Sequence, residues 1–343
     1  MLLDTIEKYM VDSSKGRLCS LDFMKFVAAI FITNSHFQPL YEDVNKSLAT
    51  FGVQGNALFF FVAGFLLMMG FDKHKGLNVV DWYKVRIRRL WPSVFLWAIV
   101  AAAIWDAPLT IPRLVLMDGY WFLQAIAVAY LLFYIFSKPL KRFGGGNKQL
   151  QYVFLLSLVV SVAYFFLMPV AESSPFHTNF HYVCHFSIMV MGGLCYIQHD
   201  KLNCNRLWKD CLVMFLSFVL YFVILKIGKG QNGIRYYAQI LALLPLHTFV
   251  YYCYKTCSYS WCQSIFQIRI LGRIITVIAV LTLEIYVVQF SVITDYFNHL
   301  FPLNIFIVFI LITFAAYLLK ILTSLFLAVL SKEHLEWKDI VKV

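Results

Sequence analysis

Long apolar stretches recur along the whole chain, separated by short polar segments. Each is close to the roughly 20 residues that a helix needs to cross the hydrocarbon layer of a membrane. Strand-like alternation of polar and apolar residues is absent, and the stretches are too long for barrel strands. We therefore predict an all-α, polytopic integral membrane protein with about ten transmembrane helices in a single bundle. The predicted spans cover residues 18–37, 51–71, 90–105, 120–137, 151–170, 182–198, 208–227, 234–254, 272–295 and 303–330. The third is short and the last two are long, so we expect tilt or breaks there.

The segments outside the spans are short. We expect a cytoplasmic N-terminal tail over residues 1–17, a transmembrane domain over residues 18–330 and a cytoplasmic C-terminal tail over residues 331–343. The first tail is rich in charged residues and has no apolar core, so it does not resemble a signal peptide. The chemistry of this protein is therefore expected in or at the bilayer.

The basic residues indicate the orientation of the chain. With a cytoplasmic N-terminus, 22 of the 29 Lys and Arg residues fall on the inner side, 5 fall in outer loops, and Lys25 and Lys320 lie within spans. This asymmetry follows the positive-inside rule. We therefore predict a multi-pass protein of the plasma or inner membrane, with both termini in the cytoplasm. The net charge of +11 is thereby explained by topology and contact with membrane lipids, so we expect no nucleic-acid partner.

Composition agrees with this prediction. Apolar residues make up 61% of the chain, and charged residues 14%, against about 25% in soluble domains. Charged side chains inside a membrane are costly and often functional, so the few polar residues within the spans are the candidate site residues.

The first span carries Lys25 and His36. Eleven residues of helix correspond to three turns plus about 20° and roughly 16 Å of axial rise, so both project from one face. Asp22 lies one turn before Lys25 and is positioned to pair with it. In the structural interpretation, Lys25 reaches the inner headgroups and His36 caps the outer helix end. In the functional interpretation, the two form a polar stripe through the span.

A basic cluster precedes the third span. Lys84, Arg86, Arg88 and Arg89 lie within the segment DWYKVRIRRLWP. Such a cluster either anchors lipid headgroups or holds a phosphate at the cytoplasmic face, because Arg matches phosphate geometry bidentately. Its position alone is compatible with both.

Other candidates lie in later spans. Glu284 is a carboxylate deep in the ninth span, and Lys25 is one possible partner for it. Asp118, Trp121 and Gln124 open the fourth span, where they either bind a sugar or form an interfacial anchor, and Tyr286 is a further candidate substrate contact.

Three histidines have the spacing of metal ligands on a helix. His177, His181 and His185 recur every four residues, but Pro175 and Asn179 disturb the helix and no carboxylate follows within the run. We therefore expect no metal.

Five motifs resemble one known family. The segments LDFMKFVAAIFITNSH, FFFVAGFLL, WYKVRIRRLWP, YWFLQAIAVAYLL and LEIYVVQF follow the order of motifs in the membrane-bound acyltransferase 3 family, across residues 20–290. The chain departs from that pattern at three positions. Lys25 stands where many members have Arg, Ala63 replaces a Ser, and Gln289 stands where a His is common.

The resemblance implies an O-acyltransferase, most often an O-acetyltransferase. The implied donor is cytoplasmic acetyl-CoA or another acyl-CoA, and the implied acceptor is a hydroxyl of a cell-envelope polysaccharide or lipid-linked saccharide. Arg86, Arg88, Arg89 and Lys25 would bind the donor, while His36 would act as general base or transient acyl carrier. On grounds of charge, Glu284 would orient His36 or stabilise its imidazolium. The alternative is a transporter or flippase of a glycan or small anion, in which the same polar residues form a transport path.

Overall fold

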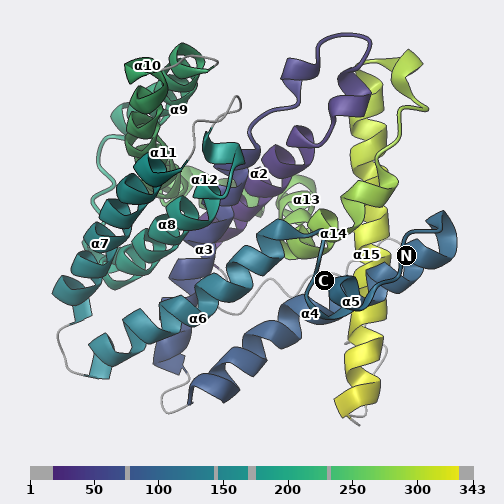
Figure 1. The fold of residues 1–343 in the computed structure, drawn as a ribbon, viewed down its shortest axis with the longest axis horizontal. Coiled ribbons are helices and arrows are strands. Elements are labelled where there is room, and N and C mark those ends of the chain that lie inside the picture. The colour runs from purple at the N-terminus through teal and green to yellow at the C-terminus, as the bar shows by residue number, and fades with distance from the viewer. Residues whose placement is uncertain (1–17, 74–77, 143–145, 169–174, 230–232, 332–343) are drawn as a thin grey trace. The chain divides into compact units, whose positions relative to one another are not determined.

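The computed structural model consists of helices joined by short loops. It describes residues 18–73, 78–142, 146–168, 175–229 and 233–331, and no strand occurs among them. Figure 1 accordingly shows coiled ribbons and no arrows. Both predicted tails lie outside these residues, except Ser331, which ends the last helix.

The longer helices are α2 (Cys19–Ser35), α3 (Gly52–Lys73), α4 (Val79–Trp105), α6 (Trp121–Arg142), α7 (Gly146–Leu167), α8 (Phe180–Ile197), α9 (Leu207–Gly228), α11 (Leu243–Cys257), α13 (Arg269–Val280), α14 (Thr282–Val292) and α15 (Leu303–Ser331). The shorter elements are η1 (Gln38–Tyr41), η2 (Lys46–Leu48), α5 (Ile111–Val115), η3 (Pro175–His177), η4 (His199–Lys201), α10 (Ile234–Tyr237), η5 (Ala238–Ala242), α12 (Ser260–Gln267) and η6 (Asn298–Leu300).

Several of the most apolar helices expose most of their surface. Only 17% of the apolar window of α9 is buried inside the structure, and 22% of the windows of α7 and α15. So much exposed apolar surface is unfavourable in water and is typical of helices that face lipid. The all-α membrane character predicted from the sequence is therefore confirmed.

Among the described residues, fewer helices are long enough to span a membrane than the roughly ten predicted. Six helices of the described residues are long and apolar enough to cross a membrane, and the pair α12 and α13, bent by 104°, raises the number to seven. The prediction counted continuous hydropathy, whereas several apolar stretches are shorter or interrupted as helices. The first span forms a helix of 17 residues, and the eighth is divided among α10, η5 and α11.

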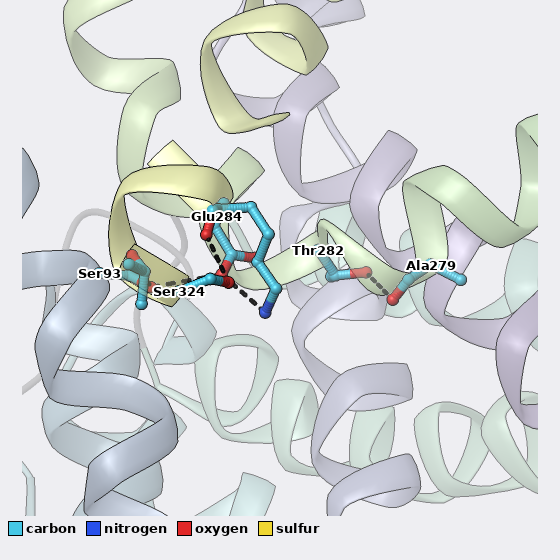
Figure 2. A network of polar contacts seen from close by, with 7 residues as sticks. Ser93, Ala279, Thr282, Glu284 and Ser324 are labelled. Carbon is cyan, nitrogen blue, oxygen red and sulfur yellow. Dashed lines mark hydrogen bonds and ion pairs between the residues drawn. The ribbon is translucent and has the colours of Figure 1, made fainter. Parts of the chain in front are cut away.

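The ninth predicted span, residues 272–295, is broken at Leu281. Leu281 ends α13 and precedes α14, and the Thr282 hydroxyl bonds to the carbonyl oxygens of Ile278 (3.1 Å) and Ala279 (2.9 Å). The second of these bonds is drawn in Figure 2. These bonds satisfy carbonyls that the break would otherwise leave without helical partners. The length of this span predicted a tilt or a break, and the structure confirms a break. Hydropathy does not locate it at Leu281, because apolar residues continue through that position.

The structure divides into two compact units, where the sequence predicted a single bundle. Unit 1 comprises residues 1–55, 81–127 and 263–343, and unit 2 comprises residues 56–80 and 128–262. The chain passes from one to the other within α3, α4, α6 and α12. The division arises because segments distant in sequence pack together, which a linear pattern does not show.

In unit 1, α2 packs against α13 and α14, and α14 packs against α15. Asn34, near the end of α2, fixes the segment that follows. Its Nδ2 donates to the carbonyl oxygens of Leu48 (2.8 Å) and Thr50 (3.1 Å), and its Oδ1 accepts from the Tyr41 hydroxyl (2.7 Å). The chain after α2 is thereby held against the end of that helix.

In unit 2, α3 and α8 approach each other closely through glycines. A Cβ added at Gly64 would overlap the carbonyl oxygen of Met189, and one added at Gly192 would overlap that of Phe61. The two helices therefore pack backbone to backbone, as small residues allow in membrane proteins.

Polar bonds also join the helices of unit 2. The Asp210 carboxylate of α9 pairs with Lys255 of α11 at 3.0 Å and accepts from the Tyr259 hydroxyl at 2.6 Å. Between α8 and α11, the Ser187 hydroxyl lies 2.8 Å from Nε2 of His247. Interhelical hydrogen bonds of this kind stabilise helix association where water is absent.

Candidate functional site

The predicted stripe of Lys25 and His36 lies on an uninterrupted helix. Because α2 is continuous from Cys19 to Ser35, the eleven-residue spacing keeps both residues on one side of it. Lys25 Nζ lies 2.9 Å from Asp22 Oδ1, so the pairing predicted from their spacing is confirmed. Lys25 is thus already paired within its own helix.

His36 occupies the C-cap of α2. Its backbone N–H donates to the carbonyl oxygen of Thr33 at 3.0 Å, so the capping interpretation holds for the backbone. The imidazole is half-buried and makes no side-chain hydrogen bond to the residues that the structure describes. Its ring packs edge-on against Phe290 of α14, with centroids 4.7 Å apart. Both ring nitrogens therefore remain available for a substrate.

Four rings from α14 and the start of α6 form an aromatic cluster beside His36: Tyr120, Phe122, Tyr286 and Phe290. The Tyr286 ring lies 5.2 Å from Phe122, 6.1 Å from Tyr120 and 5.7 Å from Phe290. The Tyr120 hydroxyl donates to the carbonyl oxygen of Val287 at 3.1 Å, which fixes the start of α6 to α14. Tyr120, Phe122 and Phe290 were not among the predicted site residues. The spacing of Tyr286 and Phe290, four apart on one helix, was the signal for Phe290.

Glu284 lies on the opposite side of α14, 1% exposed. Its Oε1 accepts from the Ser93 hydroxyl of α4 at 3.3 Å and pairs with Lys320 Nζ of α15 at 3.4 Å. Ser93 also lies 3.3 Å from the Thr323 hydroxyl. Figure 2 shows Ser93, Glu284 and Ser324 gathered where α4, α14 and α15 meet. Within the described residues, Glu284 contacts neither Lys25 nor His36, so it is Lys320 that neutralises its charge.

This geometry predicts that Lys320→Met is destabilising, because it removes the cation from a buried carboxylate. We expect the free energy of unfolding to fall by about 2 kcal/mol, below the ~3–5 kcal/mol of fully buried pairs because Lys320 is 32% exposed. Thermal melting of the purified protein in detergent measures the change.

The exposed ion pair between Lys46 and Glu42, 2.7 Å apart, supplies the matched control. Lys46→Met should leave the stability almost unchanged, because water screens an exposed ion pair. Adding Glu284→Gln to Lys320→Met should restore part of the loss, since the unpaired charge disappears. Equal melting temperatures for Lys320→Met and Lys46→Met would contradict the assignment.

The basic cluster lies on α4, which begins at Val79, and not in a loop before a short helix. Helical spacing divides the cluster between two sides, with Lys84 and Arg88 on one and Arg86 and Arg89 on the other. The Arg86 guanidinium stacks over the Trp82 ring at 4.3 Å and donates to the Trp82 carbonyl at 3.3 Å. Arg88 and Arg89 are exposed.

The three candidates at the start of α6 have different surroundings. Asp118 is exposed, in the turn where Gly119 has a φ of +86° that favours glycine. Trp121 is half-buried, with its ring 5.9 Å from Phe122. Gln124 Nε2 donates to the carbonyl oxygen of Leu116 at 3.0 Å, so it holds this turn in place. Of the three, Asp118 is the exposed one.

The histidine series begins in η3 and continues in α8. Nδ1 of His185 lies 2.6 Å from the carbonyl oxygen of His181, which makes it a donor used within the helix. The His177 side chain lies outside the described residues. Among the residues that the structure does describe, no three His, Cys, Asp or Glu side chains form a group able to hold a metal ion.

Comparison with known proteins identifies the fold. The family model described as an acyltransferase domain matches residues 19–329, which is nearly the whole chain. None of the curated proteins compared with the chain matches it. The matched region contains α2 with Lys25 and His36, the basic cluster of α4, and all of α14. The chain therefore belongs to the acyltransferase 3 family and is a membrane acyltransferase.

Proposed function

We propose that this protein transfers an acyl group from acyl-CoA to a hydroxyl of a cell-envelope polysaccharide or lipid-linked saccharide, with acetyl as the favoured acyl group. The observation that carries the proposal is the His36 imidazole. It lies at a helix end beside an aromatic cluster, with both ring nitrogens free of hydrogen bonds to the described residues. A proton acceptor so placed suits attack by a hydroxyl.

His36 would remove the proton from the acceptor hydroxyl. The oxygen would attack the thioester carbonyl, forming the C–O bond of the ester, and the C–S bond would break. The released thiolate would take the proton from the imidazolium and leave as CoA. An acyl-imidazole formed on His36 is the two-step version of the same transfer.

The donor would approach from the cytoplasmic side, where we place both termini. Arg88 and Arg89 are exposed on α4 and carry the planar guanidinium groups that fit phosphates, so they are the first candidates for the CoA phosphates. The Arg86 guanidinium is stacked on the Trp82 ring, so it would bind the donor from a fixed position. Lys25, roughly 16 Å along α2 from His36, would line the path between the two ends.

Glu284 would act as a positioning residue. Its bonds to Ser93 and Lys320 fasten α14 between α4 and α15, and α14 carries Phe290 against the His36 ring. Tyr286, with Asp118 and Trp121 at the start of α6, would contact the acceptor sugar, because aromatic rings with neighbouring polar groups suit saccharide binding.

Labelled acetyl-CoA tests the function directly. Membranes containing the protein are incubated with [1-¹⁴C]acetyl-CoA and the unmodified glycan extracted from cells in which the gene is deleted. We expect label in the glycan, a mass increase of one acetyl group per modified site, and an equal amount of CoA released.

Membranes without the protein are the control. A glycan that crosses the membrane at unchanged mass, with no CoA released, would identify a transporter and contradict the proposal. Repeating the incubation with succinyl-CoA distinguishes an acetyl from a longer acyl donor.

A further inference from the structure

Gln289 has a buried amide with no hydrogen-bond partner among the described residues. Its side chain is 0% exposed, and neither Nε2 nor Oε1 bonds to any residue that the structure describes. A buried amide left unpaired costs free energy, so such groups normally have a partner. The Gln289 amide therefore has hydrogen-bonding capacity that the described residues do not use.

This amide lies beside the His36 site. Gln289 directly precedes Phe290, whose ring packs against His36 and is 45% exposed. On α14, Gln289 lies three residues after Tyr286, and so next to the aromatic cluster on the helix surface. Gln289 therefore neighbours, along α14, both a ring that contacts His36 and a ring of the aromatic cluster.

Two more buried polar groups without partners in the described chain lie on helices that meet at the end of α2. Thr33 Oγ1, one turn before His36, is 0% exposed, and Gln54 Nε2, in the first turn of α3, belongs to a side chain that is 2% exposed. The first turn of α3 touches α2 closely, since a Cβ at Gly55 would meet Ile32 Cγ1 at 2.8 Å. α14 also packs against α2. All these residues belong to unit 1.

We propose that Gln289 binds the saccharide acceptor, with its amide bridging two adjacent hydroxyls while His36 deprotonates one of them. This inference rests on the proposed function. An amide offers a donor and an acceptor side by side, so one hydroxyl accepts from Nε2 and its neighbour donates to Oε1. A thioester carbonyl only accepts, and would leave Oε1 unpaired. The Thr33 hydroxyl and the Gln54 amide supply further bonds of the kind that a sugar requires.

The test compares kinetic constants of Gln289→Met with the wild-type protein. Methionine has nearly the same length and shape but no amide. With the glycan of deletion cells as acceptor and [1-¹⁴C]acetyl-CoA as donor, we expect kcat/KM for the glycan to fall by about 10- to 100-fold. The KM for acetyl-CoA should stay unchanged. Gln289→Glu, which keeps the acceptor oxygen and loses the N–H donors, should retain more activity than Gln289→Met.

Gln239→Met is the matched control. Gln239 is also a buried glutamine in unit 2, and only its Oε1 lacks a partner among the described residues, because its Nε2 donates to the carbonyl oxygen of Gly228 at 3.3 Å. Its replacement should lower the melting temperature and leave both KM values unchanged. Size-exclusion chromatography in detergent confirms that each variant is folded before its kinetics are measured.

The outcomes separate the two proposals. A wild-type protein that transfers no label overturns the proposed function. An active wild-type protein with an equally active Gln289→Met variant overturns the inference and leaves the function standing, as does a Gln289→Met variant in which only the KM for acetyl-CoA rises. If Gln289→Met is unfolded, Gln289→Asn provides the same comparison, since it retains both groups one methylene shorter and should raise the KM for the glycan alone.

Discussion

Replacement of His36 by alanine should lower acyl transfer to the glycan by about 10²–10⁴-fold, the usual contribution of a positioned general base. The protein should remain in the membrane at its normal level, because the imidazole makes no hydrogen bond to the described residues and packs on the half-exposed Phe290. Incorporation of labelled acetyl, normalised to the amount of protein in the membrane, measures the effect.

His36→Gln sharpens this prediction. Glutamine keeps hydrogen-bonding groups of comparable reach but cannot accept a proton near neutral pH, so it should be as inactive as alanine. His299→Ala, at an exposed position of η6, is the control and should retain full activity. Full acylation by either His36 variant would remove His36 from the mechanism.

The second large effect is expected from Gly192→Ala on α8. Helix propensity alone predicts stabilisation by about 1 kcal/mol, since alanine is the better helix former. Packing predicts the opposite, because the new Cβ would overlap the Phe61 carbonyl oxygen of α3, a backbone atom that moves only with its helix. We expect a net loss of about 2 kcal/mol in the free energy of unfolding, measured by thermal melting in detergent.

The neighbouring Gly193 provides a close comparison. A Cβ there would meet Phe133 Cζ at 2.9 Å, a side-chain atom that rotates away more easily than backbone. Gly193→Ala should therefore cost less than Gly192→Ala, and Gly64→Ala should resemble Gly192→Ala because it faces the Met189 backbone in the same contact. A higher melting temperature for Gly192→Ala would show that α3 and α8 do not pack as described.

Local features of this fold were predictable from the sequence. The apolar stretches identified the helices, and the three-residue spacing of Asp22 and Lys25 identified their ion pair. Both depend on residues close in sequence, whose relation in space follows from helix geometry alone.

Long-range features were not predictable in the same way. Glu284 pairs with Lys320, 36 residues later on another helix, and no local pattern distinguishes that partner from Lys25. Tyr120 is held in the aromatic cluster by a hydrogen bond to the backbone carbonyl of Val287. Every residue has such a carbonyl, so the sequence does not reveal this contact. The length of the ninth span indicated a tilt or a break, but its position at Leu281 was not predictable, because hydropathy reports the polarity of a segment and not the continuity of its backbone hydrogen bonds.

That interruption has an electrostatic consequence for the buried carboxylate. A helix that begins at Thr282 turns the positive end of its dipole toward its own first turn, and Glu284 lies in that turn. An unbroken helix from 269 to 292 would have offered Glu284 only mid-helix amides, whose N–H groups are already bonded. The break therefore places two sources of positive potential near the Glu284 carboxylate. One is Lys320, and the other is the backbone at the start of α14. Both stabilise a carboxylate inside a membrane-spanning region, where an isolated charge is costly.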